Sequence, residues 1–343
     1  MSNLKSVRLS LGNRTAWPNG ARFSVVRARS VGSSGRLVTG RVLLSAFASL
    51  AVFASTAPSA GAVLVYVRPS SHEVVVARDD GSQPRVVAHG LYARVSPDGR
   101  QLVYEPARGR AELRVMSVRG GRSWLVARNP AASPGVPSTD VSWSPNGRYI
   151  AVGQDPDGLV LYDVVRRRRR HLGPVVSGGE SFSPESSRLA FQSNDVREND
   201  LLVTNVATGK VRRLAQYAES PVWGRGGLAY IQAKKPAGLI LKTRRSRLLV
   251  PFDSSVMYPV EWSRDGRRLL AAKVSPQFPL HAFLIAPSTR RITTLSPVFK
   301  EVDALSRDGT VVLGVINGDV VTVTASGTVT LLAHGADSAS WTR

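Results

Sequence analysis

One short turn motif recurs along this chain and limits its fold more than any other feature. Its clearest copy is Ser144-Pro145-Asn146-Gly147, which is followed by an apolar run from Tyr149 to Val152. The proline presets φ and the Asn-Gly pair accepts positive φ, so the motif predicts a tight turn. The β-branched and aromatic residues after it predict a buried strand. Each copy of the motif therefore predicts one β-hairpin.

Copies of the motif return at a regular interval along the chain. The anchor position, held by serine in the clearest copy, is occupied in turn by Ser96, Ser144, Ser183, Gly224, Ser263, Ser306 and Thr342. Successive anchors are 36 to 48 residues apart. A period of about 40 residues, with about four short strands per unit, is typical of β-propeller blades. One repeat position carries tryptophans that we expect in the core of the blades: Trp143, Trp223, Trp262 and Trp341.

The two ends of the repeat region complement each other. The run from Val63 to Val67 matches the second strand of a repeat but has no turn motif before it, and the chain ends on a first strand at Trp341. Pairing these two strands would complete one blade and remove two open sheet edges. We therefore predict an all-β, seven-bladed β-propeller over residues 63–343, closed by N- and C-terminal strands that share one blade. A six-bladed ring with an extra edge strand is the alternative.

The repeats resemble those of a known family. Trp-Ser-Pro-Asn-Gly-Arg at residues 143–148 and Asn-Asp-Leu-Leu-Val-Thr-Asn-Val-Ala-Thr-Gly-Lys-Val-Arg-Arg-Leu at residues 199–214 look like the WD40-like repeats of TolB-type β-propellers. The resemblance covers nearly all of residues 63–343. It implies the fold and says little about function, because such propellers serve as periplasmic interaction modules and as non-catalytic domains of peptidases. The best-known member adds an N-terminal domain, for which we expect no counterpart in residues 1–62.

Residues 1–62 have the pattern of a targeting segment with a long n-region. Arg36 and Arg41 precede an apolar run from Val42 to Ala54, and Ala60-Gly61-Ala62 offers a small-residue cleavage site. Because the apolar run is short for a transmembrane helix, a cleaved signal is favoured over an uncleaved anchor or a chance pattern. We expect the protein to be exported, to the periplasm, the cell envelope or the medium.

The composition limits the classes of site that the chain can carry. It has 343 residues, no cysteine and a formal net charge of +22. Without cysteine there is no disulfide framework and no thiolate metal site. Residues 1–62 contain eight basic residues and no acid, so cleavage would lower the charge from +22 to +14. The exported chain would remain strongly basic.

Many of the basic residues are predicted on one face of the propeller. The turns after the first and third strands of each blade share a face, and there the sequence places many arginines but few acids, chiefly Asp79 and Asp80. The sharpest feature is a run of five candidate partner-binding residues: Arg166, Arg167, Arg168, Arg169 and Arg170.

A strongly basic face attracts anionic partners by electrostatic steering. We expect an acidic protein or an anionic envelope polymer as the partner, with contact to a membrane surface as a further option. The alternative is that the arginines only solvate the turns. Nucleic acid is not expected, because no groove with interleaved aromatic residues accompanies the charge. We expect a monomer.

Acidic residues precede several innermost strands and are predicted around the mouth of a central channel. The candidates are Asp140, Glu180, Glu219, Glu261, Asp303 and Asp337. Converging carboxylates can hold a divalent cation or act as an acid–base pair. Their distances from the anchor residues differ, so they need not form one ring. Capping and solvation are the favoured roles, and we predict no bound cofactor, with a divalent cation in the channel as the alternative.

No motif of a known catalytic class occurs in the sequence. The five histidines are not at metal-ligand spacing, and there is neither a His-Glu-x-x-His nor a Gly-x-Ser-x-Gly motif. We therefore predict an exported, non-catalytic protein- or polymer-binding propeller of the cell envelope. The alternative is a propeller lyase or hydrolase that acts at the channel mouth. A cluster of His171 or His281 with the acids would favour that enzyme.

Overall fold

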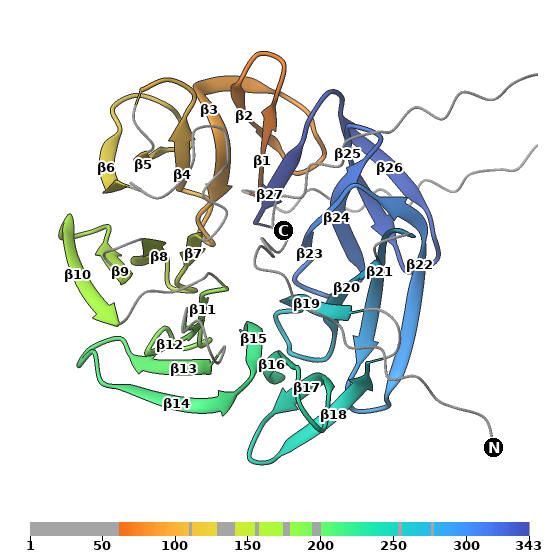
Figure 1. Ribbon diagram of the computed structural model, residues 1–343. Helices are drawn as coiled ribbons and strands as arrows, with labels where there is room; N and C mark the ends of the chain where they lie inside the picture. Colours follow the sequence, from red (N-terminus) through yellow and green to blue (C-terminus); the bar gives the residue numbers. More distant parts are fainter. Residues whose placement is uncertain are drawn as a thin grey trace, which may run out of the picture. The chain divides into compact units, whose positions relative to one another are not determined.

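The computed structural model describes residues 62–109, 112–128, 141–154, 158–173, 179–193, 200–252, 256–275 and 278–342. In these ranges the regular structure consists of β-strands, and every paired strand is antiparallel to its neighbour. Asp140 and residues 1–61 of the predicted targeting segment lie outside the described residues. The strands form sheets arranged in a ring (Figure 1).

Five blades are separate four-stranded sheets, each ordered from the innermost strand outward. Blade 3 contains β7 (Val141–Trp143), β8 (Tyr149–Gln154), β9 (Gly158–Asp163) and β10 (Arg168–Gly173). Blade 4 contains β11 (Ser181–Phe182), β12 (Arg188–Gln192), β13 (Asp200–Asn205) and β14 (Val211–Gln216). Blade 5 contains β15 (Ala218–Gly224), β16 (Gly227–Gln232), β17 (Gly238–Lys242) and β18 (Ser246–Pro251). Blade 6 contains β19 (Val256–Trp262), β20 (Leu269–Ser275), β21 (Phe278–Ala286) and β22 (Arg291–Phe299). Blade 7 contains β23 (Glu301–Leu305), β24 (Val311–Ile316), β25 (Asp319–Thr324) and β26 (Val329–Ala333).

The remaining seven-stranded sheet is two blades that share one long strand, β3 (Arg85–Val95). Residues 85–89 pair with β2 and are the outermost strand of blade 1, whereas residues 90–95 pair with β4 and are the innermost strand of blade 2. Blade 1 is completed by β27 (Ser338–Trp341), β1 (Val63–Arg68) and β2 (Glu73–Arg78). Blade 2 is completed by β4 (Gln101–Pro106), β5 (Glu112–Ser117) and β6 (Trp124–Arg128). The strand pairing therefore gives the seven four-stranded units that the repeats predict.

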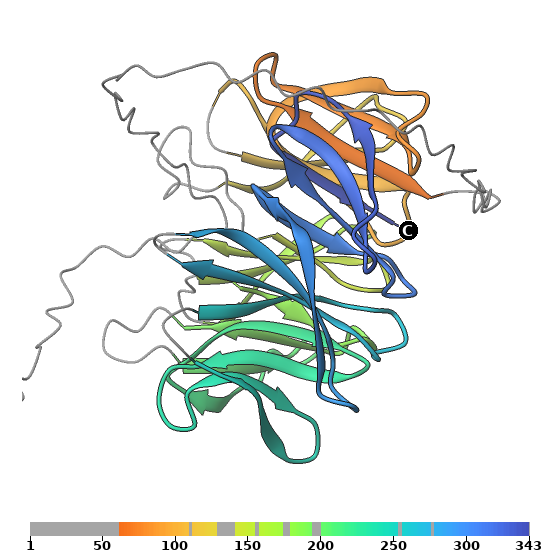
Figure 2. The same cartoon turned by 90° about the vertical axis from the view of Figure 1, so that its right-hand side faces the viewer.

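The ring is closed by the two ends of the repeat region, as the sequence predicts. The first strand β1 and the last strand β27 pair antiparallel, with Leu64 opposite Trp341 and Val67 opposite Ser338. The backbone N–H of Val63 also donates to Thr342 Oγ1 at 3.0 Å. In Figure 1 and in the side view of Figure 2, orange β1 and dark-blue β27 lie side by side. Blade 1 thus joins residues from opposite ends of the chain.

The recurring turn motif is held by one hydrogen-bond pattern. In the copy at Ser144, the serine Oγ donates to Asn146 Oδ1 at 2.7 Å and accepts from the Tyr149 N–H at 2.8 Å. Asn146 Oδ1 also accepts from the Arg148 N–H at 3.0 Å. Gly147 has φ of +69°, which glycine adopts without the penalty that a side chain would bring. The equivalent bond from the serine Oγ, made there to an aspartate carboxylate, occurs in three further turns, Ser96–Asp98, Ser263–Asp265 and Ser306–Asp308.

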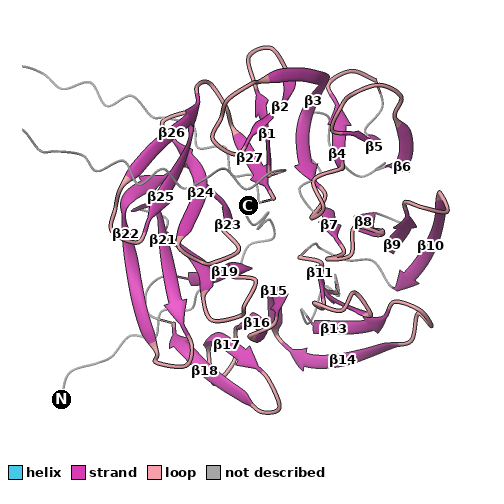
Figure 3. Ribbon diagram, turned by 180° about the vertical axis from the view of Figure 1, so that it is seen from behind, coloured by secondary structure: helices cyan, strands magenta, loops and turns pink. Residues whose placement is uncertain are grey.

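Apolar clusters between neighbouring blades form the core. One cluster joins Leu270 and Leu284 of blade 6 to Val312 and Val321 of blade 7. The repeated tryptophan position contributes to these interfaces: Trp143, Trp262 and Trp341 are buried, while Trp223 is half-buried. The prediction that these tryptophans are core residues is therefore confirmed for three of the four. Figure 3 shows the innermost strands around the centre of the ring.

Candidate functional site

Two sets of turns lie at one end of the ring, because strands within each blade alternate in direction. We call this end the turn face. It consists of residues 79–84, 96–100, 118–123, 144–148, 164–167, 183–187, 206–210, 225–226, 243–245, 263–268, 287–290, 306–310 and 325–328. Its fifteen basic residues are Arg100, Arg119, Arg122, Arg148, Arg166, Arg167, Lys210, Arg225, Arg244, Arg245, Arg264, Arg267, Arg268, Arg290 and Arg307. Its six acidic residues are Asp79, Asp80, Asp98, Glu185, Asp265 and Asp308. The turn face is therefore strongly basic.

Four of these acids, at positions 98, 185, 265 and 308, belong to the turn motifs and are absent from the sequence-based count. Their carboxylates stabilise the turns themselves. Asp265 Oδ1, for example, accepts from Ser263 Oγ at 2.7 Å and from the Arg267 N–H at 2.9 Å. These local hydrogen bonds lower the pKa of Asp265, so this carboxylate stays ionised. The excess of positive charge on the turn face is smaller than the sequence alone suggests, but it remains.

The five-arginine run is divided between a turn and a strand. Arg166 and Arg167 occupy the turn after β9, whereas residues 168–170 begin β10, the outermost strand of blade 3. All five side chains are exposed. The sequence-based assignment of the whole run to the turn face is therefore correct for only its first two residues.

Two arginines of the run stabilise the contacts of blade 3 with its neighbours. The Arg167 guanidinium lies 4.5 Å from the centre of the Trp124 ring of blade 2, which is a cation–π contact. The Arg170 guanidinium donates to the backbone oxygens of Val206 and, at 2.7 Å, Ala207 in blade 4. These contacts give part of the run a structural role whatever partner the protein has.

The acids predicted at the channel mouth do not lie at one level along the ring axis. Glu180 directly precedes β11, and Glu219 is the second residue of β15. Asp337 directly precedes β27 and forms an ion pair with Lys300. Burial raises the pKa of Glu219. These residues lie near the starts of the innermost strands, at the end of the ring opposite the turn face.

A second group of charged side chains lies on the innermost strands and comes from three blades. We call it the axial cluster: Arg94 on β3, Glu261 on β19, and Glu301 and Asp303 on β23. Arg94 attracts Glu261, Glu301 and Asp303 electrostatically. Arg94 is accessible to solvent, so water screens part of this attraction. The cluster joins blade 2 to blades 6 and 7 in one electrostatic network.

Hydrogen bonds to backbone groups hold the axial cluster in place. Glu261 Oε2 accepts from the Leu305 N–H of the next blade at 2.7 Å. Arg94 Nη1 donates to the Val141 carbonyl of blade 3 at 3.4 Å. Each of these side chains therefore connects the innermost strand that carries it to the innermost strand of the following blade.

The carboxyl groups of the axial cluster are all easier to protonate than usual. Burial is the main reason that the pKa of Glu261 is raised. Burial also raises the pKa of Glu301 to about 7. The pKa of Asp303 is raised well above its usual value, first by burial and then by the charge of Glu301. Shifted carboxyl groups of this kind occur at functional sites more often than elsewhere.

The histidines that would favour an enzyme do not join these acids. His171 lies on β10, the outermost strand of blade 3, and His281 lies on β21, the third strand of blade 6. Among the described residues, no group of three or more histidines or acids is arranged to hold a metal ion. Nor does any helix in the described part of the chain have the length and apolarity of a membrane span.

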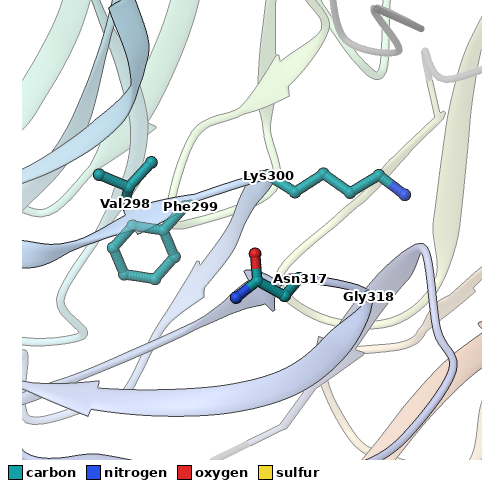
Figure 4. Close-up of a pocket in the computed structure, with 5 residues that line it drawn as sticks. All are labelled: Val298, Phe299, Lys300, Asn317 and Gly318. Atoms are coloured by element: carbon teal, nitrogen blue, oxygen red, sulfur yellow. The ribbon is translucent and has the colours of Figure 1, made fainter. Parts of the chain in front are cut away.

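A shallow hollow of about 500 Å³ lies between the connection from blade 6 to blade 7 and the loop after β24. It is lined by Val298, Phe299, Lys300, Asn317 and Gly318. Figure 4 shows the Lys300 side chain extending away from the Phe299 ring. The ammonium group of Lys300 is already paired with a carboxylate. The hollow is therefore a weaker candidate for a functional site than the axial cluster.

Sequence analysis missed Arg94 and did not select Glu301 as a site residue. A positional signal for Arg94 exists, because Arg94 precedes its anchor Ser96 by two residues, as Glu261 precedes Ser263. Ser340 occupies the same position before Thr342, and its Oγ accepts from the Val95 N–H at 3.1 Å. Side chains at this repeat position therefore face the next innermost strand, whatever their charge.

Comparison with solved structures finds the propeller fold in proteins of different activity. An oligogalacturonate lyase in complex with manganese is 14% identical over 79% of this chain and 83% of that chain, with a TM-score of 0.56. TolB from Acinetobacter baumannii is 14% identical over 82% of this chain and 66% of that chain, with a TM-score of 0.52. A puromycin-hydrolyzing peptidase from Mycobacterium tuberculosis is 16% identical over 81% of this chain and 53% of that chain, with a TM-score of 0.55.

No family model matches the sequence, and no curated protein matches it either. The fold defines the class of protein: a β-propeller that shares its architecture with TolB and with lyase and peptidase propellers. At 14% to 16% identity the similarity establishes the fold alone. Function therefore has to be argued from the residues of this chain.

Proposed function

We propose that this chain is an exported, non-catalytic binding propeller of the cell envelope, which holds an acidic protein or an anionic polymer on its turn face. The observation that carries the proposal is the excess of fifteen basic over six acidic residues on that face. Some of these acidic side chains already accept hydrogen bonds within the turns, as Asp265 does. Such a surface attracts polyanions over about one Debye length, roughly 10 Å at moderate salt.

The opposite end of the ring also carries acidic residues. Several acids there are paired with nearby cations, as in Arg213–Asp200 at 3.2 Å and Arg68–Glu73 at 3.1 Å. Local pairs of opposite charge produce little field at a distance. Such a pair also occurs on the turn face, between Arg267 and Asp265 at 3.6 Å, so the proposal rests on the excess of basic residues there.

The test compares charge reversals at the two ends of one blade. Arg244 and Arg245 are exposed on the turn face of blade 5, and Lys234 and Lys235 are exposed at its other end. Binding of the full chain to poly-L-glutamate and to polyphosphate is measured at about 50 mM and about 500 mM NaCl. We expect Arg244→Glu/Arg245→Glu to weaken low-salt binding by about tenfold, and high salt to abolish the difference.

The matched control is Lys234→Glu/Lys235→Glu, which changes the net charge by the same amount. It also removes a contact of Lys234 with the Tyr217 ring, so its folding is checked by circular dichroism. The control variant should bind nearly as tightly as the wild type. If both variants lose affinity equally, net charge alone drives binding and the turn face is not the site. No binding to either polymer at low salt would leave solvation as the role of the arginines.

An enzyme acting at the ring axis is the second candidate, because the axial cluster contains carboxyl groups with raised pKa values. A carboxyl group with a pKa near neutrality can act as a general acid. The binding function is favoured because neither His171 nor His281 is on an innermost strand. Turnover of oligogalacturonate or of an aminoacyl amide, lost in Glu301→Gln, would favour the enzyme instead.

A further inference from the structure

The strand that closes the ring, β27, is held by contacts with three neighbours. It pairs with β1 inside blade 1, and Ser340 Oγ accepts from the Val95 N–H of blade 2. From blade 7, the Asp303 carboxyl group of β23 lies near the Ala339 N–H of β27. The strands β27 and β1 come from opposite ends of the repeat region, and hydrogen bonds and packing hold them together. Release of β27 would therefore open the ring.

The contact from blade 7 contains two neighbouring carboxyl groups. Glu301 and Asp303 are separated by one residue on β23, and their carboxyl groups are close enough to interact directly. A hydrogen bond between two carboxyl groups requires a proton on one of them. Two carboxylates this close cannot both ionise without a large Coulomb cost, so such pairs titrate as a unit.

The surrounding charges only partly compensate this pair. Glu301 faces Lys300 and Arg94 as cations, Asp337 as an anion, and the Tyr258 hydroxyl. Lys300 is already paired with Asp337. Arg94 also attracts Glu261, and it is the one cation shared by three carboxyl groups of the axial cluster.

Asp303 has the same shortage of partners. Its neighbours are Glu301, Arg94, Tyr258 and the Ala339 N–H. Its Oδ2 atom is buried and has no hydrogen-bond partner among the described residues. A proton is the simplest group that would relieve both the repulsion and the unmet hydrogen-bonding capacity.

We propose that Glu301 and Asp303 form a proton-binding site in which two carboxyl groups share one proton, and that loss of this proton with rising pH loosens the closing strand β27. The nearby Ala339 N–H favours ionised Asp303, but burial and the charge of Glu301 outweigh it. The folded ring therefore prefers the protonated pair. This inference concerns ring closure and is independent of the function proposed for the turn face.

The sign of the pH dependence follows from the direction of the shifts. The pKa of Glu301 is raised to about 7, and that of Asp303 is raised as well. A carboxyl group with a raised pKa in the folded state contributes stability at low pH, and this stability is lost as the pH rises through the folded-state pKa. The junction should be tight in mild acid and looser above about pH 7.

Hydrogen exchange of the β27 amides in the full chain tests the proposal between about pH 5 and about pH 9, after correction for intrinsic exchange. The reference is β16 in blade 5. We expect protection of β27 to fall by about tenfold relative to β16 as the pH rises. Glu301→Gln, which keeps a neutral side chain of similar size, should remove most of this fall.

The control variant is Glu185→Gln, which neutralises a carboxyl group on the turn face that pairs with Arg188 at 2.9 Å. It should keep the wild-type pH dependence of β27. The same dependence in Glu301→Gln as in the wild type would overturn the proposal. If Glu301→Gln does not fold, Asp303→Asn supplies the comparison. Protection of β27 in the wild type that stays flat or rises with pH would overturn it without any variant.

Discussion

Single side chains connect the innermost strands of neighbouring blades. These strands have a sheet neighbour on one side only, so backbone N–H groups on the other side need partners. Glu261 accepts from the Leu305 N–H at 2.7 Å, and Ser181 accepts from the Trp223 N–H at 2.8 Å. A serine or a carboxyl group can fill this role because both offer an oxygen acceptor. The charge of Glu261 is therefore not needed for the contact.

Two substitutions at position 261 separate the hydrogen bond from the charge. Glu261→Ala leaves the Leu305 N–H without its acceptor, which costs about 1–3 kcal/mol of unfolding free energy. Glu261→Gln keeps an acceptor and replaces a carboxyl group whose pKa burial already raises. The unfolding free energy of this variant should therefore stay within about 1 kcal/mol of the wild type. Urea denaturation at neutral pH measures both. Equal losses in the two variants would show that the charge matters more than the acceptor.

At the level of the element, blade 5 has the one turn in which glycine replaces the anchor serine, and the structure explains the exception. The Trp262 ring of blade 6 lies against this turn and donates from Nε1 to the Val222 carbonyl at 3.1 Å. A Cβ added at Gly224 would lie 2.3 Å from Trp262 Cγ, and one at Gly226 would lie 2.2 Å from Cζ3. The glycines thus make room for the tryptophan of the next blade.

Restoring the repeat's usual serine at this turn should therefore destabilise the protein. Gly224→Ser forces the Trp262 ring or the turn to move, and overpacking of this kind costs about 1–3 kcal/mol. The comparison variant is Ser263→Gly, which removes the anchor hydroxyl from the following turn and with it the bond to Asp265. Thermal denaturation should give a lower Tm than the wild type for both variants. A higher Tm for Gly224→Ser would show that agreement with the repeat outweighs the contact.

For the whole molecule, stability depends on closing a ring whose two ends meet only through non-covalent contacts. The chain has no cysteine, so a new disulfide would be the only one. Val67 and Ser338 lie opposite each other in the β1–β27 ladder. Neighbouring positions in antiparallel strands are close enough for a disulfide.

The double variant Val67→Cys/Ser338→Cys should lock the ring when oxidised. A disulfide that closes a long loop adds about 2–4 kcal/mol by restricting the unfolded chain. Guanidinium denaturation with and without a reductant measures the difference within one protein, so the reduced form is its own control. An oxidised form no more stable than the reduced one would mean that β27 does not limit unfolding. Oxidation should also reduce the pH dependence of β27 exchange.

Local features of the sequence determined the fold. The regular recurrence of the turn motif predicts the blades, because serine, Asx and glycine specify a turn without distant contacts. The unmatched second strand at Val63 and the unmatched first strand at Trp341 predict the shared closing blade. Both are present in the structure, as is the buried position of Trp143 and Trp262. These predictions need only the pattern of each repeat and the positions of the two unmatched strands.

Only the tertiary structure decided which charged groups meet. Arg94 and Asp303 are 209 positions apart in the chain, yet ring closure brings their blades around one axis. Only the packing of neighbouring blades shows that Arg167 lies over Trp124. Residues 168–170 of the same run belong to strand β10. Glycine at position 224 has a reason only once the Trp262 ring is in place. A repeat specifies each blade through local hydrogen bonds. The contacts between blades depend on how the ring closes, and the pKa values of the buried carboxyl groups depend on those contacts.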